Sequence, residues 1–392
     1  MKQSISKQTI SNPILSIVIP TKNRQEFCVK SVEHIVSLGL DNVEVVIQDN
    51  SDVDLLRNQL TDAGILGKVK YNYNSAILSF TDNFSEAISL CTGKYICMIG
   101  DDDSVLPNIK QIAQYALDNN LDAVIPKLAV YFWPTANPIN PRWRNGFLTS
   151  LPYRKNLYEK VDVENALIDL VKNSFQDYQK LNIPRIYHGI VKRECIEKVK
   201  NKCGTYFGGL TPDMFMSVSL CFTVNSVCTY SKPFTISGIC PRSGSADSAT
   251  GRHTGELKDA PHFKGHKSYN WIDYIPDIYT VDTIWAETGI QALRSMGGEK
   301  YETYFDKKVF IATLIHKFPQ FTTRLYRIGE KYNISMNIVA KINRKISRNQ
   351  KLDMFLLRLK KLLTFDFARK YYNTATIDEA CSILCNLYNI KS

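Results

Sequence analysis

Residues 93–103 read GKYICMIGDDD, and this stretch decides the fold class. Its apolar segment, residues 95–99, predicts a buried parallel strand, and the consecutive carboxylates Asp101, Asp102 and Asp103 follow directly. Ligands of open α/β sheets bind at the carboxyl ends of the strands. Adjacent carboxylates repel one another, so this cluster is typical of a site for Mg²⁺ or Mn²⁺, completed by phosphate oxygens. The alternative is a solvated acidic turn before the helix predicted near residue 107.

Strands and helices alternate on both sides of this stretch. Further strands are predicted at residues 15–20, 43–49, 69–73 and 122–126, with helices at 24–38, 52–63, 82–90 and 107–119. This order is typical of parallel βαβ units and predicts an α/β fold with a mostly parallel sheet. Residues 127–160 predict an irregular loop, and residues 186–191 and 234–239 predict two more strands. From residue 260 onward we expect helices only.

The composition predicts a globular protein of the cytoplasm. Of its 392 residues, 44% are hydrophobic and 22% are charged, as in ordinary globular proteins. No run of 18 apolar residues occurs, and residues 1–13 form a polar tail without the apolar core of a signal peptide. Ten cysteines without a CxxC pair indicate a reducing compartment.

The positive charge of the chain is concentrated near its C-terminus. The net charge is +11, and residues 317–372 hold 14 Lys and Arg against 3 Asp and Glu, a difference of +11. The rest of the chain is therefore neutral overall. This distribution predicts an anionic partner for the C-terminal third.

Three segments resemble the signatures of family 2 glycosyltransferases of the GT-A fold. They are IVIPTKNR at residues 17–24, IQDNS at 47–51 and GKYICMIGDDD at 93–103. The resemblance covers roughly residues 14–245 and implies a bacterial enzyme of polysaccharide or glycan assembly, acting on a nucleotide diphosphate sugar. It divides the chain into a polar tail (1–13), a donor-binding half (14–126), an acceptor half with the catalytic general base and a mobile loop (127–259), and a basic helical region (260–392).

The resemblance places the donor at the ends of the first two strands. Pro20, Thr21 and Arg24 follow the first strand, and Asp49 ends the second, where it would accept the imide N–H of uracil or thymine. This predicts a UDP- or dTDP-sugar. Asn83 is carried over as a donor-binding residue in the same way. An Asp-Asn-Ser turn at Asp49 and a simple helix N-terminal residue at Asn83 are the alternatives.

The acidic cluster departs from the usual family pattern. Gly100 stands where a first Asp is usual, so either the metal motif is shifted in register or one ligand is lost. We expect Asp103 or Asp102 to be the direct ligand of Mg²⁺ or Mn²⁺. Asp101 is expected near the ribose, with Asp102 also contributing to donor binding. One aspartate suffices when the diphosphate supplies further oxygens.

The acceptor half offers a candidate general base. Residues 208–215, GGLTPDMF, match the place of the base in the family, at the start of a helix, and this selects Asp213. A first-turn acid that the helix dipole favours is the alternative. Arg242, Ser243 and His253, in a Gly- and Ser-rich loop, are expected to reach the leaving diphosphate; a solvated loop is the other interpretation.

Two apolar stripes run through the basic region. One comprises Ile334, Ile338, Ile342 and Ile346, and the other lies within residues 352–363. They predict either a helical subdomain with a solvated basic face or an amphipathic surface on anionic lipid. Family 2 acceptors are often lipid-linked, so the second option implies a peripheral protein at the inner membrane face. No aromatic–basic interleaving occurs, so nucleic acid is not expected.

Taken together, these features predict an inverting, metal-dependent transferase whose acceptor is a glycan or a lipid-linked glycan. Two alternatives remain. One is a catalytically inactive glycan-binding or scaffold protein with the same fold, which the displaced acidic cluster favours. The other is a nucleotidyltransferase, although the Gly-rich basic loop after its first strand is missing here.

Overall fold

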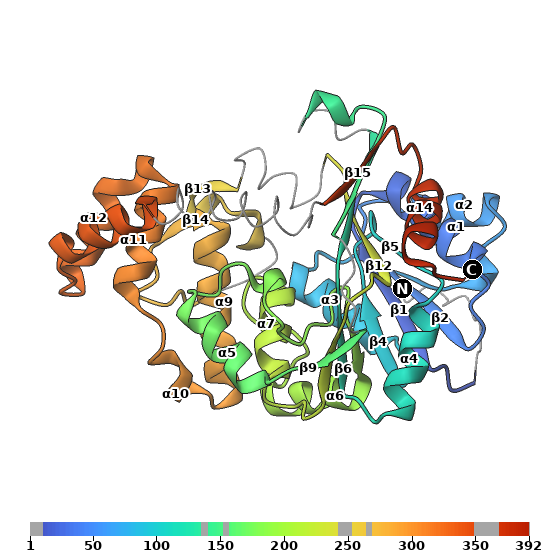
Figure 1. The fold of residues 1–392 in the computed structure, drawn as a ribbon, viewed down its shortest axis with the longest axis horizontal. Coiled ribbons are helices and arrows are strands. Elements are labelled where there is room, and N and C mark those ends of the chain that lie inside the picture. The colour runs from blue at the N-terminus through green and yellow to red at the C-terminus, as the bar shows by residue number, and fades with distance from the viewer. Residues whose placement is uncertain are drawn as a thin grey trace.

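The computed structural model describes residues 11–134, 140–151, 157–241, 253–263, 269–348 and 368–391. An eight-stranded sheet forms its centre, in the order β3-β2-β1-β4-β10-β6-β11-β9 (Figure 1). Strands β3 to β4 are parallel to one another, whereas β10 is antiparallel to both of its neighbours. The bounds are β1 Leu15–Thr21, β2 Val43–Asp49, β3 Lys70–Tyr73, β4 Tyr95–Met98, β6 Ala123–Pro126, β9 Tyr158–Lys160, β10 Ile190–Lys192 and β11 Val227–Tyr230.

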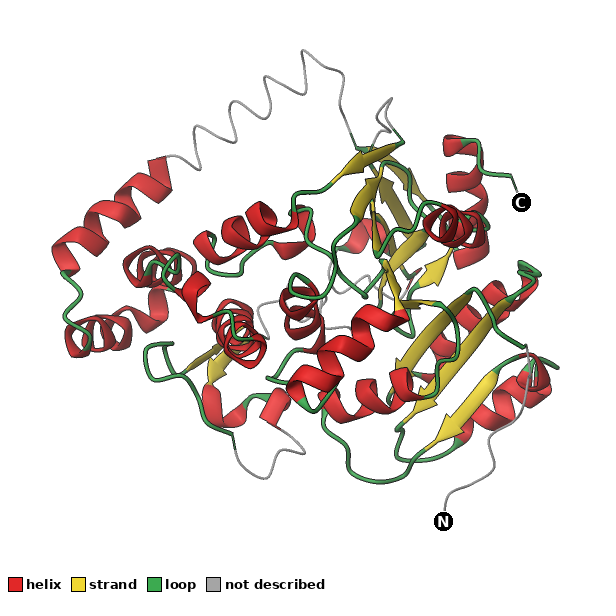
Figure 2. Cartoon of the chain, turned by 90° about the horizontal axis from the view of Figure 1, so that it is seen from below, coloured by secondary structure: helices red, strands yellow, loops and turns green. Residues whose placement is uncertain are grey.

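Helices cover both faces of this sheet (Figure 2). Every residue of β1 and β2 is buried, as expected for parallel strands between two helical layers. Helices α1 (Gln25–Ser37), α2 (Leu55–Asp62) and α4 (Ile109–Asp118) pack on one face. The other face is covered by α3 (Phe80–Ser89), α5 (Val163–Lys172), α6 (Arg193–Cys203), α7 (Pro212–Leu220) and α9 (Val281–Met296). The predicted α/β class is confirmed.

A second, five-stranded sheet corrects the expected loop at residues 127–160. Its order is β15-β8-β7-β12-β5, with bounds β5 Ser104–Val105, β7 Ala129–Phe132, β8 Phe147–Ser150, β12 Thr235–Ile239 and β15 Arg369–Tyr372. β9 also falls in the range that we expected to be irregular. β7, β8 and β9 have three or four residues each, too few for a period-2 pattern to stand out among Pro and Asn, whereas β12 agrees with the strand predicted at residues 234–239.

The C-terminal region is not purely helical. Strands β13 (Thr254–Glu256) and β14 (Ile278–Thr280) form a hairpin, and β15 pairs with β8. The expectation of helices only was wrong for β14 and β15 because both are short and owe their conformation to a partner strand. Helices α10 (Glu299–Glu302), α11 (Lys307–Lys317) and α12 (Thr322–Lys331) follow the hairpin, and α14 (Ile377–Tyr388) returns to α1 (Figure 1).

The first apolar stripe packs inward. Residues 336–348 are helical, and Ile334 and Val339 are buried in the larger core. Ile342 and Ile346 pack against the same core, whereas Ile338 is exposed. The second stripe, residues 352–363, lies outside the described residues. In the part of the chain that the structure describes, no helix is both long and apolar enough to cross a membrane.

Candidate active site

A cavity of about 470 Å³ lies where the ends of the parallel strands face the second half of the chain. Arg24, Asp102 and Asp103 line one part of it, and Asp213 and His253 line others. These residues come from segments that are far apart in the sequence. The remaining lining includes Phe80, Phe84, Tyr178, Gln179, Tyr187, Leu210, Thr211, Pro212, Ser237, Gly238, His262, Tyr279, Val281, Ile284 and Trp285.

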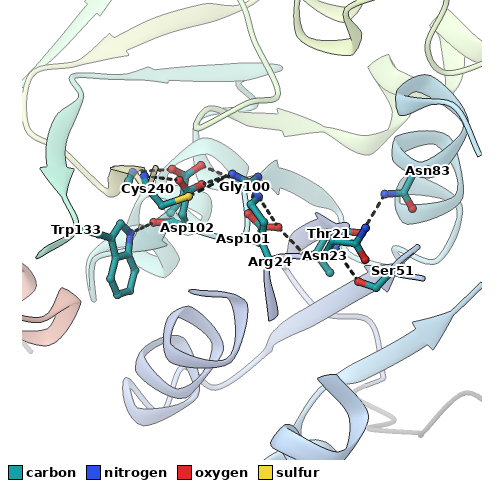
Figure 3. A network of polar contacts seen from close by, with 12 residues as sticks. Thr21, Asn23, Arg24, Ser51, Asn83, Gly100, Asp101, Asp102, Trp133 and Cys240 are labelled. Atoms are coloured by element: carbon teal, nitrogen blue, oxygen red, sulfur yellow. Dashed lines mark hydrogen bonds and ion pairs between the residues drawn. The ribbon is translucent and has the colours of Figure 1, made fainter. Parts of the chain in front are cut away.

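Arg24 and Asp101 form a charged pair at the edge of the cavity (Figure 3). The two guanidinium nitrogens Nη2 and Nε lie 2.6 and 3.1 Å from Asp101 Oδ1 and Oδ2. Thr21 Oγ1 donates to Asp101 Oδ2 at 2.6 Å. Burial raises the pKa of Asp101 to about 6, against the lowering effect of Arg24. Asp101 thus holds Arg24 and the end of β1 together and is not among the residues that line the cavity.

Asp103 is buried, and polar groups surround its carboxylate. Its Oδ2 accepts from the backbone N–H of Gly100 at 2.6 Å and from the Tyr187 hydroxyl at 2.9 Å, and its Oδ1 accepts from the Gly238 N–H at 2.7 Å. His188 Nε2 lies 3.3 Å from Oδ2, but burial lowers the pKa of His188 to about 3, so the ring is neutral. Burial also raises the pKa of Asp103 to about 6. Both carboxylate oxygens are therefore engaged within the protein.

Asp102 keeps one carboxylate oxygen with a single long contact. Its Oδ2 accepts from the Cys240 N–H at 3.0 Å, whereas Oδ1 has the guanidinium of Arg24 at 3.6 Å. Its backbone carbonyl accepts from Trp133 Nε1 at 2.9 Å, and this bond fixes the backbone of the loop at Asp102 (Figure 3). Burial raises the pKa of Asp102, and Arg24 opposes that shift. Of the two acids of this loop that line the cavity, Asp102 and Asp103, Asp102 therefore has the less occupied carboxylate.

Gly100 is required by the close approach of its neighbours. A Cβ atom there would lie 2.6 Å from the Tyr187 hydroxyl and 3.0 Å from Asp103 Oδ2. Tyr187 thus occupies the space that a side chain at position 100 would need. This contact gives a structural reason for glycine at the position where the resembled family usually has its first Asp.

The residues predicted to bind the donor at the ends of the first two strands lie beside the acidic loop. Asp49 is buried at the end of β2, where its oxygens accept from the Ser51 N–H at 2.8 Å and the Tyr71 hydroxyl at 2.9 Å. Burial raises the pKa of Asp49, and the bonds from Ser51 and Tyr71 oppose this. Asn83 Nδ2 donates to the carbonyl of Thr21 at 3.3 Å, while its buried Oδ1 has no partner among the described atoms. Pro20 is buried within β1.

Asp213 stands in the first turn of α7, away from the acidic loop in sequence but on the same cavity. Tyr178, which is 1% exposed, donates its hydroxyl to Asp213 Oδ2 at 2.9 Å. Burial raises the pKa of Asp213, while the Tyr178 hydroxyl and the Met214 N–H lower it. The carboxylate is thus oriented by a neighbour and made more basic by its surroundings, as a general base requires.

Of the three loop candidates, only His253 is described. It lines the cavity and packs near His262 and Tyr279, with ring centroids 6.0 and 5.7 Å away. Arg242 and Ser243 lie outside the described residues. His262 also stacks on Phe80 at 5.7 Å, so the β13–β14 hairpin region reaches the start of α3 across the cavity.

Sequence reasoning missed several residues that shape the site. Tyr178, Tyr187 and His188 surround the predicted acids, and Trp285 stands against Tyr178 with ring centroids 5.2 Å apart. These residues lie in segments without a motif. His188, in the run YHG at residues 187–189, has a positive φ of 65°. The sequence does not indicate this backbone conformation.

The charge of the acidic loop fits a divalent cation. Asp101 and Asp102 share the guanidinium of Arg24, Asp103 accepts from the neutral donors Gly100, Tyr187 and Gly238, and burial raises the pKa of all three carboxyls. Their ionised forms therefore lack compensating positive charge. Among the described residues, no three His, Cys, Asp or Glu side chains are grouped as metal ligands on their own.

Comparison with known proteins agrees with these features. Residues 16–181 match the sequence model of Glycosyl transferase family 2, in agreement with the resemblance drawn from the three motifs. WcaA of Escherichia coli, a putative colanic acid biosynthesis glycosyl transferase, is 26% identical over 189 residues, 43% of this chain and 64% of that protein. The abequosyltransferase RfbV of Salmonella typhimurium is 30% identical over 119 residues, 28% of this chain and 34% of its own length.

The chain therefore covers less than two thirds of either relative. Among solved structures, S. aureus TarS in complex with UDP aligns with a TM-score of 0.45 at 14% identity, over 86% of this chain and 91% of that one.

Proposed function

We propose that this chain is a glycosyltransferase that moves a sugar from a UDP- or dTDP-sugar to a hydroxyl of a glycan or lipid-linked glycan. The observation that carries the proposal is the single cavity lined by Arg24 and Asp102 from the first half and by Asp213 from the second. The family match over residues 16–181 and the glycosyltransferase names of the relatives support it.

In this proposal the first half binds the donor. The nucleobase would lie at the ends of β1 and β2, near Asp49, whose carboxylate also accepts from Ser51 and Tyr71, and near Asn83, whose Oδ1 has no partner among the described atoms. Asp102 is the proposed ligand of Mg²⁺ or Mn²⁺, with donor phosphate oxygens and water completing the shell. The ion would supply positive charge to the departing diphosphate. Arg24 and His253 face the same cavity, and Arg242 and Ser243 stay proposed partners of the diphosphate.

In the second half, Asp213 would act as the base of an inverting displacement. Its carboxylate would take the proton of the acceptor hydroxyl as that oxygen attacks the anomeric carbon and the bond to the diphosphate breaks. Tyr178 would hold the carboxylate in place through its 2.9 Å bond to Oδ2. The aromatic lining around it, including Trp285, would exclude water from this side of the cavity.

Nucleotide binding and transfer test this proposal together. The purified protein is titrated with UDP and Mn²⁺ by calorimetry, and UDP release is measured with a panel of nucleotide sugars. Asp102→Asn and chelation with EDTA should each abolish metal-dependent binding and transfer. Asp41→Asn removes a carboxylate that pairs with Lys110 on the surface and serves as the matched control. Full transfer in EDTA would contradict the metal assignment.

Gly100 favours one alternative, a non-catalytic glycan-binding protein of the same fold. Tyr187 fills the space of the missing side chain, so the site has one acid fewer than the usual family pattern. Such a protein would bind UDP with Mn²⁺ but release no UDP from any nucleotide sugar in the presence of acceptor. The same two measurements therefore separate the alternatives.

The basic face of residues 336–348 is a further part of the proposal. Lys341, Arg344, Lys345 and Arg348 are exposed on this helix, while its apolar stripe packs inward. Their spacing of three and four residues places them on one face. We propose that this face rests on anionic lipid and holds the protein at the inner membrane surface, near a lipid-linked acceptor.

Arg324, on α12 just before this basic helix, connects the C-terminal helices to the strands beside the cavity. Its guanidinium pairs with Glu256 of β13 and with Asp277 just before β14, each at 2.8 Å, and this hairpin region carries His253 and Tyr279. Docking of the basic face would thus orient the cavity relative to the membrane. Arg344→Glu with Lys345→Glu should reduce co-sedimentation with anionic liposomes, whereas the exposed pair Lys30→Glu with Lys68→Glu should not. Equal binding of both variants would contradict docking through this face.

A further inference from the structure

The C-terminal segment returns across the molecule to the back of the acidic loop. β15 forms one edge of the five-stranded sheet, and β5, which follows Asp103 directly, forms the other edge. α14 then packs over this sheet and against α1 (Figure 1). Its buried residues Ile377, Ala380, Cys381, Leu384 and Tyr388 share one core with Phe27, Leu106, Tyr131, Trp133, Leu148 and Ile236.

One polar link joins α14 to the strand after the acidic loop. The buried ring of His34, on α1, has Nδ1 at 2.7 Å from Asp378 Oδ1 and Nε2 at 3.3 Å from the backbone carbonyl of Val105. Asp378 lies in the first turn of α14, and Val105 is two residues after Asp103. His34 therefore spans the gap between the C-terminal helix and the acidic loop.

A second link runs through Trp133. Its indole Nε1 donates to the backbone carbonyl of Asp102 at 2.9 Å. The ring packs against Phe27 and Tyr131 with centroids 5.2 and 5.3 Å apart, inside the core that α14 completes. A Cβ atom at Gly238 would lie 1.6 Å from the same Asp102 carbonyl and 3.1 Å from Trp133 Nε1, so β12 also packs closely against this point of the loop.

From these contacts we infer that α14 positions the acidic loop, with Asp378, His34 and Trp133 as positioning residues. Asp102 lines the cavity, and its backbone carbonyl is contacted by both Trp133 and β12, so these contacts fix where its side chain starts. A displacement of about 1 Å at a binding group can cost up to about 100-fold in rate or affinity. Contacts that hold the backbone of Asp102 in place should therefore affect ligand binding. The consequence for ligand binding rests on the proposed function, since it concerns the metal and the nucleotide.

The test compares two neighbouring carboxylates on one helical turn. Asp378→Asn removes the charge that faces His34, and Glu379→Gln removes an equal charge whose carboxylate accepts only from the Ala375 N–H among the contacts described. UDP binding with Mn²⁺ should weaken about tenfold in Asp378→Asn and remain native in Glu379→Gln. Trp133→Phe, which keeps the aromatic packing, should weaken binding to a similar extent, and Asp378→Glu should restore part of it.

Hydrogen exchange separates this inference from the proposed function. Backbone amides of residues 101–106 should exchange faster in Asp378→Asn than in the native protein or in Glu379→Gln, whether or not UDP binds. If native protein binds no UDP with Mn²⁺, the proposed function fails. The exchange rates of residues 101–106 then decide by themselves whether α14 positions the acidic loop. Native exchange at residues 101–106 in both Asp378→Asn and Trp133→Phe would overturn the inference.

Discussion

The hydrogen bond from Tyr178 to Asp213 allows a quantitative prediction for the pKa of the proposed general base. Tyr178→Phe removes one hydroxyl and keeps the ring that packs against Trp285. A hydrogen bond to a charged group contributes about 1.5–3 kcal/mol. At about 1.4 kcal/mol per pKa unit, its loss should raise the pKa of Asp213 by roughly 1–2 units. The ionised carboxylate is the form that loses the donor, so the shift is upward.

The assay is the pH dependence of kcat/KM for sugar transfer. Asp213 must be ionised to accept a proton, so activity falls as pH drops through its pKa. The acid limb of Tyr178→Phe should therefore lie roughly 1–2 pH units above that of the native enzyme, whereas kcat/KM on the alkaline plateau should change less. UDP affinity should stay native, because the hydroxyl that this variant removes donates to Asp213, which is not a proposed donor-binding residue.

A matched variant controls for the loss of a tyrosine–carboxylate bond. Tyr301 donates to Glu164 Oε1 at 2.8 Å, and neither residue lines the cavity. Tyr301→Phe should leave the pH profile in place even if it lowers thermal stability. An unshifted acid limb in a stably folded Tyr178→Phe would refute the assignment of Asp213 as a base held by Tyr178.

Three further expectations concern the same cavity. Asp213→Asn should lower transfer about 10²–10⁴-fold and leave UDP affinity near native; loss of UDP binding instead would make Asp213 a structural residue. Asp49→Ala should weaken UDP binding by roughly 1–3 kcal/mol, with UDP or dTDP preferred over GDP in native protein, and competition assays check both. Burial raises the pKa of Asp101 and Asp103 to about 6, so the folded state binds these protons more tightly than the unfolded state. The metal-free protein should therefore lose stability as pH rises from about 4 through 6, and Mn²⁺ with UDP should raise the melting temperature more at pH 7 than at pH 5; an equal shift at both would contradict this.

The donor half of the fold could be predicted from the sequence because its signals are local. Each strand of the parallel core is a short apolar run, each intervening helix has its own periodicity, and polar residues stand where the runs end. Since parallel strands end at one edge, the sequence predicts that Thr21, Asp49 and Asp101 lie near one another, and Thr21 donates to Asp101 in the structure.

The five-stranded sheet could not be predicted in this way. β15 reads Arg-Lys-Tyr-Tyr, and its residues are mostly exposed, so nothing in its own sequence indicates a strand. It becomes one because β8 offers unpaired backbone groups. The same holds for β5, two residues long, which pairs with β12 from the other half of the chain.

What the sequence by itself determined is the α/β class, the match of residues 16–181 to the model of Glycosyl transferase family 2, and the candidate acids Asp102, Asp103 and Asp213. Only the tertiary structure decided how the three consecutive acids Asp101, Asp102 and Asp103 differ from one another. Three identical carboxylates in a row have the same local chemistry, yet Asp101 pairs with Arg24, Asp103 accepts from Gly100, Gly238 and Tyr187, and Asp102 lines the cavity with only a 3.6 Å contact from Arg24 to its Oδ1. The physical reason is that hydrogen-bond partners and burial come from segments far away in the chain, and these set the charge and reach of a side chain.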